Sequence, residues 1–355
     1  ENDIEARQVF NAFNSFYNTR RIIRSEIDDI NLHQSVLGKI GQKLEPLTKY
    51  AGFDWKINIA LISSLAAKEN SHLPVFCSVT FEEDKKTLMG TDPLTMVNLI
   101  QDMGIDALGI NCSLGPDKMA GVIEEILQYS RIPVLIQPNA GLPKIVDGQT
   151  VFDIDIEHYV HGMSKIIDLG VKIIGGCCGT TPEYIKRLKD LIKDTVPKQI
   201  QAMPMTAASS STKTVILDDR IHIIGERINP ANKKILEALQ NQDMNFIIDE
   251  AINQAEAGAH ILDVNAGYSE ADERETLLEA IKSIETVVDL PILINSSNPD
   301  AIEKAVRYYN GKPIIGPVNG KKSVMDAVFP IAKKYGTCVI ALTIDEKGLP
   351  QSCEE

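Results

Sequence analysis

The fold is decided by residues 106–138, which read DALGINCSLGPDKMAGVIEEILQYSRIPVLIQP. The stretch has two short apolar runs, residues 106–111 and 133–138, on either side of a segment whose apolar residues recur at helical spacing. Two strands that are apolar on both faces, joined by a helix, are typical of a parallel sheet covered by helices. Residues 106–138 are therefore expected to form a βαβ unit.

The same alternation continues on both sides of this unit. Further strands are expected at residues 74–80, 172–176, 222–225, 260–265, 291–295, 313–315 and 338–343. Helices are expected at residues 93–102, 117–129, 156–168 and 181–192. We predict an α/β protein with two (β/α)8 TIM-type barrels, both incomplete in this chain, because one such barrel takes about 250 residues.

Breaks in the alternation suggest the domain boundaries. Residues 1–195 are assigned to a first domain, residues 196–218 to a linker that includes TAASSST, and residues 219–355 to the N-terminal part of a second domain. The front part of the first domain is atypical, with one long amphipathic helix expected at Asp3–Ile27. The chain does not begin with Met, so a fragment of a longer protein is one explanation of the missing strands.

The composition limits the classes of function. A formal net charge of -13 disfavours nucleic acid and anionic membrane surfaces as partners. The apolar runs fall short of the roughly 20 residues that span a bilayer, and the chain start lacks a secretory signal. Six cysteines are too few for a secreted disulfide scaffold, so we expect a cytoplasmic protein with reduced thiols.

Three cysteines follow expected strands. Cys112 follows the strand at 106–111, and Cys177 and Cys178 follow the strand at 172–176, so all three are expected at the carboxyl ends of strands, where barrels hold their active sites. Three thiolates suit Zn²⁺ and leave its fourth tetrahedral position free. Inert buried cysteines are the alternative, but the glycines flanking the pair favour metal binding. The other cysteines, Cys77, Cys338 and Cys353, lack such a context.

The motifs around these cysteines resemble the homocysteine S-methyltransferase family. They are GINCSLGP at 109–116, QPNAG at 137–141 and GGCCGTTP at 175–182. The resemblance implies that Cys112, Cys177 and Cys178 bind zinc, and that the sulfur of homocysteine takes the fourth position and becomes a nucleophile. Asn111 and Asn139 are candidates for homocysteine binding, with turn capping as the alternative role. The family's opening Asp-Gly-x-x-Gly-Thr strand is missing before residue 73.

The motifs of the second half resemble pterin-binding methyltransferases and dihydropteroate synthase. They are IGERINP at 224–230, ILDVNAG at 261–267, NP at 298–299 and VNGK at 318–321. The resemblance implies a pterin site at Glu226, Asn229, Asp263, Asn265 and Asn295. The sequence departs from the family at Asn295, where an Asp is typical, and at Gly316-Pro317, where Asn-Ser is typical. An amide offers one carbonyl acceptor where a carboxylate offers two, so weak or absent folate binding is expected.

Together the resemblances imply a methyltransferase that passes a methyl group from methyltetrahydrofolate, via methylcobalamin, to zinc-activated homocysteine, giving methionine. The sequence has no Asp-x-His-x-x-Gly motif, so the cobalamin is expected on a separate corrinoid-binding domain or protein. Two alternatives remain: a non-catalytic zinc-binding homologue, and a homocysteine methyltransferase that uses another methyl donor.

Overall fold

The computed structural model describes residues 74–112, 114–146, 149–269, 272–350 and 352. The helix expected at Asp3–Ile27 lies outside the described residues. Among the described residues, no helix is long and apolar enough to cross a membrane.

The first half forms a parallel sheet of four strands in the order β1-β2-β3-β6. Its strands are β1 (Phe76–Val79), β2 (Ala107–Asn111), β3 (Val134–Gln137) and β6 (Ile173–Ile174). The helices are α4 (Pro93–Ile100), with the short 3-10 helix η2 (Gln101–Met103) after it, α5 (Pro116–Tyr129), α6 (Ile156–Leu169) and α7 (Pro182–Leu191). Each element lies where the sequence predicted it, which confirms the βαβ pattern.

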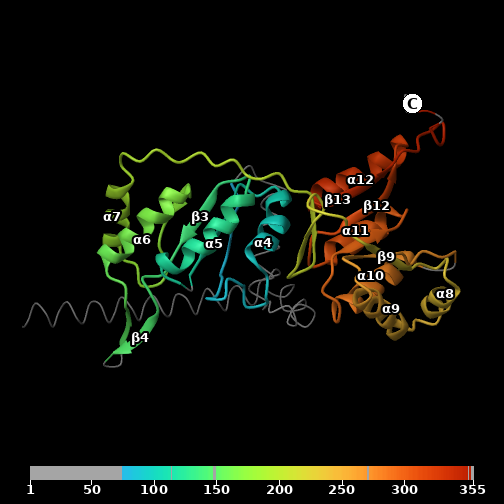
Figure 1. Ribbon diagram of the computed structural model, residues 1–355, viewed down its shortest axis with the longest axis horizontal. Coiled ribbons are helices and arrows are strands. Elements are labelled where there is room, and N and C mark those ends of the chain that lie inside the picture. Colours follow the sequence, from blue (N-terminus) through green and yellow to red (C-terminus); the bar gives the residue numbers. More distant parts are fainter. Residues whose placement is uncertain (1–73, 113, 147–148, 270–271, 351, 353–355) are drawn as a thin grey trace, which may run out of the picture. The chain divides into compact units, whose positions relative to one another are not determined.

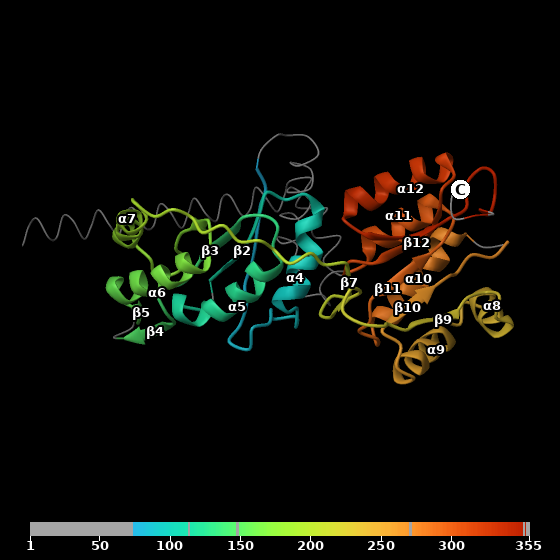
Figure 2. The ribbon, with the colours of Figure 1, turned by 45° about the horizontal axis from the view of Figure 1, so that its top comes forward.

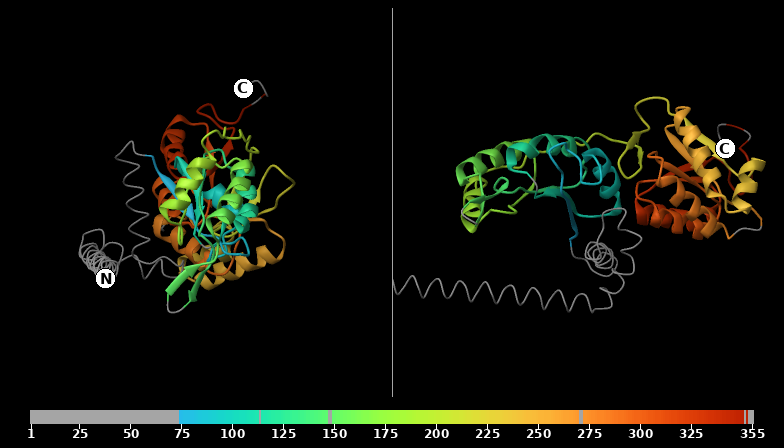
Figure 3. Two further views of the ribbon diagram at one scale, coloured as in Figure 1. Left: turned by 90° about the vertical axis from the view of Figure 1, so that its left-hand side faces the viewer. Right: turned by 90° about the horizontal axis from the view of Figure 1, so that it is seen from below.

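The helices of this half lie along one face of the sheet (Figures 1 and 3). Leu108 and Ile136 from the strands, and Ile123 and Met163 from the helices, are buried in one core cluster. Burial of each such side chain stabilises the folded state by about 1.5–3 kcal/mol. Asp155 begins α6 by accepting a hydrogen bond from the His158 amide at 2.9 Å.

A hairpin of two short antiparallel strands follows β3, and the sequence did not predict it. It consists of β4 (Pro143–Val146) and β5 (Gln149–Phe152), at the lower left of Figure 1. Ile145 is 81% exposed, and Leu142 and Val151 are exposed as well. These apolar side chains are exposed to solvent. The sequence of the hairpin therefore does not show the alternation of apolar and polar residues that indicates a half-buried strand.

The second half forms a parallel sheet of five strands in the order β13-β12-β11-β10-β9 (Figure 2). Its strands are β9 (Ile224–Ile228), β10 (Ile261–Val264), β11 (Ile292–Asn295), β12 (Ile314–Asn319) and β13 (Cys338–Leu342). The helices are α8 (Lys233–Gln240), α9 (Met244–Glu256), α10 (Glu273–Glu285), α11 (Pro299–Tyr308) and α12 (Lys322–Tyr335). The predicted strands are confirmed, and both halves are parallel α/β structures.

The segment predicted to be a loose linker contains a buried hairpin instead. Strands β7 (Ala207–Ser209) and β8 (Thr214–Ile216) pair antiparallel, and all three residues of β7 are 0% exposed. Ala208 packs in a cluster with Ile261 and Leu293 from the second sheet. The TAASSST stretch, which was expected to belong to a linker, therefore contains a buried strand. Small Ala and Ser side chains fit closely against the strands, although their composition resembles that of a linker.

The two faces of the second sheet differ in what covers them. On β10, Leu262 and Val264 join the helix-side core, whereas Ile261 packs against the β7–β8 hairpin. Side chains two residues apart on a strand share a face, so Asp263 lies on the same face as Ile261, one step closer to the carboxyl end. The hairpin thus covers the apolar part of this face. The polar residues follow toward the carboxyl ends of the strands.

Candidate metal centre and polar strand ends

The structure brings Cys112, Cys177 and Cys178 together. The sulfur of Cys112 lies 2.7 Å from that of Cys177 and 3.9 Å from that of Cys178, and the Cys177 and Cys178 sulfurs are 3.9 Å apart. Among the described residues, these three form the group of His, Cys, Asp or Glu side chains that could hold a metal ion. Cys112 and Cys177 are half-buried, and Cys178 is exposed, so the group opens to solvent.

The segment after β3 acts as a template for all three cysteines. The backbone amide of Cys112 donates to the carbonyl of Gln137 at 3.0 Å, and that of Cys177 donates to the carbonyl of Pro138 at 2.8 Å. The amide of Cys178 donates to the side-chain oxygen of Asn139 at 3.0 Å. Three consecutive residues thus fix the backbone of the three cysteines, because β3 lies between β2 and β6 in the sheet.

Two backbone conformations in the left-handed region allow the cysteines to converge. Cys112 has φ 60°, a conformation that costs a residue with a side chain roughly 1–2 kcal/mol. Gly179, directly after the pair, has φ 81°, and a Cβ there would lie 2.3 Å from the Phe152 ring. A glycine is therefore required at position 179, because the backbone there has a positive φ and because a side chain would collide with Phe152.

The chemistry of the three thiols fits a bound cation. Burial, together with the hydrogen bonds to Cys177 and Cys178, raises the pKa of Cys112 to about 12. Crowded thiols resist ionisation together, and a divalent cation reverses this preference. Ligands at about 2.3 Å from a tetrahedral zinc lie about 3.8 Å apart, which matches the two separations of 3.9 Å. The Cys112–Cys177 separation of 2.7 Å would have to widen by about 1 Å.

The two asparagines predicted to bind homocysteine lie next to these thiols. Asn139 is 6% exposed, and its carbonyl oxygen already accepts from the Cys178 amide, so its N–H groups are what it can offer a ligand. Asn111 is half-buried at the end of β2, in register with Gln137 and adjacent to Cys112. Asn139 therefore has the turn-fixing role that was considered as its alternative.

A row of polar side chains marks the strand ends of the second sheet. The Asn265 amide donates to the Asn295 oxygen at 3.3 Å, and the Asn295 amide donates to Asp263 at 3.1 Å. The other oxygen of Asp263, Oδ1, is buried and has no hydrogen-bond partner among the described residues. Burial raises the pKa of Asp263, donation by Asn295 lowers it, and the charge of Glu226 raises it. The row thus contains a buried carboxylate oxygen without a hydrogen-bond partner among the described residues.

The remaining predicted pterin residues stand apart from this hydrogen-bonded row. Glu226 is exposed on β9 and acts on Asp263 through its charge. Asn229 caps a turn, because its side-chain oxygen accepts from the Ala231 amide at 3.0 Å. Gly316 is in register with Asn295, and a Cβ there would lie 3.0 Å from the Ile340 Cβ.

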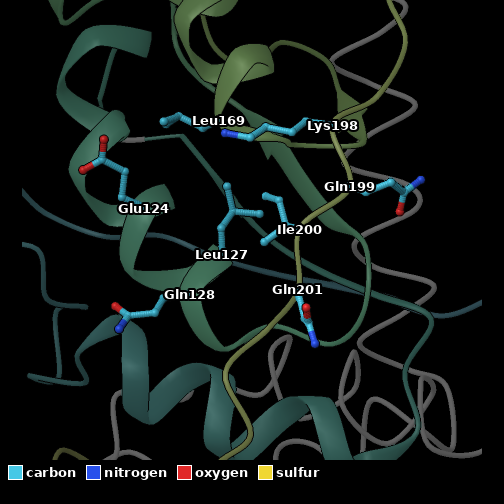
Figure 4. A pocket seen from close by; sticks show the side chains of 8 residues that line it. All are labelled: Glu124, Leu127, Gln128, Leu169, Lys198, Gln199, Ile200 and Gln201. Carbon is cyan, nitrogen blue, oxygen red and sulfur yellow. The ribbon is translucent and has the colours of Figure 1, made fainter.

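A hollow of about 380 Å³ lies beside α5 and includes none of these predicted site residues in its lining (Figure 4). It is lined by Glu124, Leu127, Gln128, Leu169, Lys198, Gln199, Ile200 and Gln201. These residues lie near the C-terminal ends of α5 and α6 and on the segment after α7. In a βα unit that end is opposite the carboxyl ends of the strands, so the hollow is a packing seam remote from the thiols.

Comparisons with known proteins match both halves of the chain. The homocysteine S-methyltransferase family model matches residues 55–192, which include the three cysteines, and the pterin binding enzyme model matches residues 225–355. The chain joins a homocysteine S-methyltransferase domain to a pterin-binding domain. It is also a distant homologue of methionine synthase.

The similarity to methionine synthase extends over most of the chain. It is 28% identical to the enzyme of Mycobacterium leprae over 298 residues, 80% of this chain and 25% of that protein. It is 27% identical to the enzyme of Mycobacterium tuberculosis over 311 residues, 84% of this chain and 26% of that protein. The chain thus spans about a quarter of the length of the curated relatives it matches.

Solved structures superpose poorly on the whole chain. A dihydropteroate synthase from Xanthomonas albilineans gives a TM-score of 0.22 at 12% identity, covering 76% of this chain and 87% of that one. The carboxyl transferase domain of Rhizobium etli pyruvate carboxylase gives 0.23 at 11% identity, covering 76% and 40%. TM-scores this low do not define the fold of the chain, which is described by its two parallel sheets.

One residue of the homocysteine S-methyltransferase domain was missed by reading the sequence. Tyr159 on α6 is fully buried, and its hydroxyl reaches the carbonyls of Gly175, just before the cysteine pair, and of Pro138 in the template segment. Its position in the sequence, in a helix expected to pack by its apolar face, gave no sign of this contact.

Proposed function

We propose that this chain is the part of a methionine-forming methyltransferase that activates homocysteine and presents a folate methyl donor. The observation that supports the proposal is the convergence of three thiols at the strand ends of the homocysteine S-methyltransferase domain. Each sheet is proposed to belong to a (β/α)8 barrel. The domain boundaries proposed are 1–195 for the first domain, 196–218 for the connection and 219–355 for the second domain.

In the first domain, Cys112, Cys177 and Cys178 would hold zinc through their sulfurs. Zinc, when bound there, would lower the pKa of the substrate thiol, so that homocysteine reacts as a thiolate at neutral pH. The exposed side of Cys178 leaves a way in for the substrate. The N–H groups of Asn139 and the side chain of Asn111 would hydrogen-bond the amino acid part of homocysteine.

In the second domain, Asp263, Asn265 and Asn295 are proposed to bind the pterin ring of methyltetrahydrofolate, with Glu226 and Asn229 nearby in the same family motif. The unpaired oxygen of Asp263 can accept an N–H group of the ring. The methyl group would reach homocysteine through methylcobalamin on a separate domain or protein. A sulfur–carbon bond forms on homocysteine, and the donor keeps the electron pair of the bond that breaks.

The metal content of the reduced chain, measured by mass spectrometry, tests the first part of this proposal. About one zinc per chain is expected in the unaltered protein and none in Cys177→Ala. Cys77→Ala is the control, because Cys77 lies on β1 outside the thiol group. Formation of methionine from homocysteine and added methylcobalamin then tests catalysis. A folded, reduced chain without zinc would overturn the proposal, and zinc without turnover would favour the non-catalytic homologue.

A second candidate is a homocysteine methyltransferase that takes its methyl group from another donor. The amide of Asn295 favours it, because both its donor and its acceptor are engaged with Asp263 and Asn265. Calorimetric titration with methyltetrahydrofolate separates the candidates. Binding supports the folate donor, and no binding by a zinc-loaded chain that methylates homocysteine supports the other donor.

A further inference from the structure

Tyr159 places a polar group deep in the core of the first domain. The residue lies on α6 and is 0% exposed. Its hydroxyl oxygen is 3.0 Å from the carbonyl oxygen of Gly175 and 3.3 Å from that of Pro138. The single hydroxyl proton is thus donated between two carbonyls that directly follow different strands of the sheet, β6 and β3.

The Gly175 carbonyl belongs to the segment that carries Cys177 and Cys178, and the Pro138 carbonyl belongs to the template segment that accepts the cysteine amides. Gly175 lies two residues before Cys177, at the end of β6. Pro138 is the middle residue of the template segment after β3, and its carbonyl also accepts the Cys177 amide at 2.8 Å. A movement of the hydroxyl would therefore be transmitted to the backbone of Cys177 through either carbonyl.

The aromatic ring fixes where this hydroxyl lies. The Tyr159 ring meets the Tyr184 ring edge-on, with centroids 5.3 Å apart and an interplanar angle of 82°. The Tyr184 hydroxyl donates to the carbonyl of Ile154 at 2.8 Å, directly before the residue that caps α6. The pair ties α7 to the start of α6, so the position of the Tyr159 hydroxyl is set by helix packing.

Packing alone does not require a hydroxyl at this position. A phenylalanine would fill nearly the same volume, and a buried tyrosine hydroxyl needs one hydrogen-bond partner of any kind. Here one acceptor lies on the segment that carries Cys177 and Cys178, and the other lies on the template segment that accepts the cysteine amides. We propose that Tyr159 is a positioning residue of the metal centre, whose hydroxyl fixes the distance between these two segments.

Burial raises the pKa of Tyr159 above its ordinary value, and the charge of Cys177 raises it further. The Tyr159 hydroxyl therefore keeps its proton at neutral pH and acts as a hydrogen-bond donor to the two carbonyls. The inference rests on the proposed zinc site but concerns a residue outside it.

The experiment compares Tyr159→Phe with Tyr184→Phe in the full chain. Each variant removes one hydroxyl from the same aromatic pair, but of the two only the Tyr159 hydroxyl bonds to the segment that carries Cys177 and Cys178. Zinc affinity is measured by competition with a chromogenic chelator, and the thiolate-to-metal absorption bands are recorded with Co²⁺. We expect Tyr159→Phe to weaken zinc binding about tenfold and to shift the Co²⁺ bands. Tyr184→Phe is expected to leave both within about twofold of the unaltered chain.

The outcomes separate this inference from the proposed function. No zinc binding by the unaltered chain would remove the metal centre itself. Equal zinc affinity and equal Co²⁺ spectra in Tyr159→Phe and the unaltered chain would overturn the positioning role, even if the variant melted earlier. If Tyr159→Phe does not fold, 3-fluorotyrosine at position 159 keeps the hydroxyl. Its ¹⁹F resonance is expected to shift on zinc addition far more than that of 3-fluorotyrosine at position 184, and equal shifts would overturn the inference.

Discussion

The side-chain oxygen of Asn139 accepts a hydrogen bond from the backbone amide of Cys178, 3.0 Å away. It completes a series in which the Gln137 and Pro138 carbonyls accept the amides of Cys112 and Cys177. Asn139 is the one member of the series that acts through its side chain, so a substitution can remove its contribution without changing the backbone.

Asn139→Ala is expected to weaken zinc binding about tenfold in the absence of homocysteine, because the Cys178 amide loses its acceptor. The metal-free chain should lose about 1–2 kcal/mol of unfolding free energy. Chelator competition and urea unfolding measure the two effects. Asn111→Ala is the control, since the Asn111 side chain is not the acceptor of a cysteine amide. Equal zinc affinity in the two variants would mean that Asn139 serves the substrate alone.

The left-handed conformation of Cys112 predicts that the metal-free chain tolerates Gly better than Ala at this position. Cys112→Gly relieves the cost of φ 60°, so it should be more stable than Cys112→Ala by about 1 kcal/mol in zinc-free urea unfolding. At Cys77, in the extended strand β1, the order should reverse, with Ala the more stable by about 0.5–1 kcal/mol. The same order at both positions would show that residue 112 carries no such strain.

Gly109 on β2 is in register with Leu135 on β3. A Cβ at this position would lie 2.2 Å from the backbone oxygen of Leu135, which cannot move without disturbing the sheet. Gly109→Ala should therefore lower the free energy of unfolding by about 3 kcal/mol or more. Urea unfolding followed by circular dichroism measures this loss. Gly121→Ala is the comparison, because its Cβ meets the flexible end of Lys85 and the change suits helix α5. Gly121→Ala should leave the free energy of unfolding unchanged or raise it by up to about 1 kcal/mol. Equal losses of stability in the two variants would contradict the close contact between Gly109 and Leu135.

Glu285 makes the stability of the second domain depend on pH. Burial raises its pKa from 4.5 to about 7, although the Asn310 amide donates to one oxygen. Because the folded pKa lies above the ordinary value, protonation of Glu285 stabilises the folded state. This stabilisation is fully present below pH 4.5 and is lost as the pH rises through about 7. Glu285→Gln should therefore be more stable than the unaltered chain at pH 8, by on the order of 2–3 kcal/mol, with little difference near pH 5.

Urea unfolding from pH 5 to pH 8 measures this difference. Glu279→Gln on the same helix α10 is the control, because Glu279 is exposed and pairs with Lys282 at 2.9 Å. An exposed pair of this kind contributes little, so the control should follow the unaltered chain at every pH. Parallel pH profiles for Glu285→Gln and the unaltered chain would contradict the role of Glu285.

The sequence by itself determined the alternation of strands and helices in both halves. Apolar runs such as Val134–Gln137 and amphipathic segments such as Ile156–Leu169 form through short-range periodicity, which can be read along the chain. It also determined the zinc-ligand candidates, because Cys112 and the Cys177–Cys178 pair each follow a strand, and parallel strands bring their carboxyl ends to one edge.

The tertiary structure decided what depends on contacts between distant segments. The β7–β8 hairpin forms where the sequence resembles a linker, because small side chains pack closely under Ile261 and Leu293. Asn139 serves the Cys178 amide, and Tyr159 spans Pro138 and Gly175, only because the sheet places β3 beside β6. Such hydrogen bonds join residues far apart in the chain, and no local pattern encodes which partners the fold will bring together.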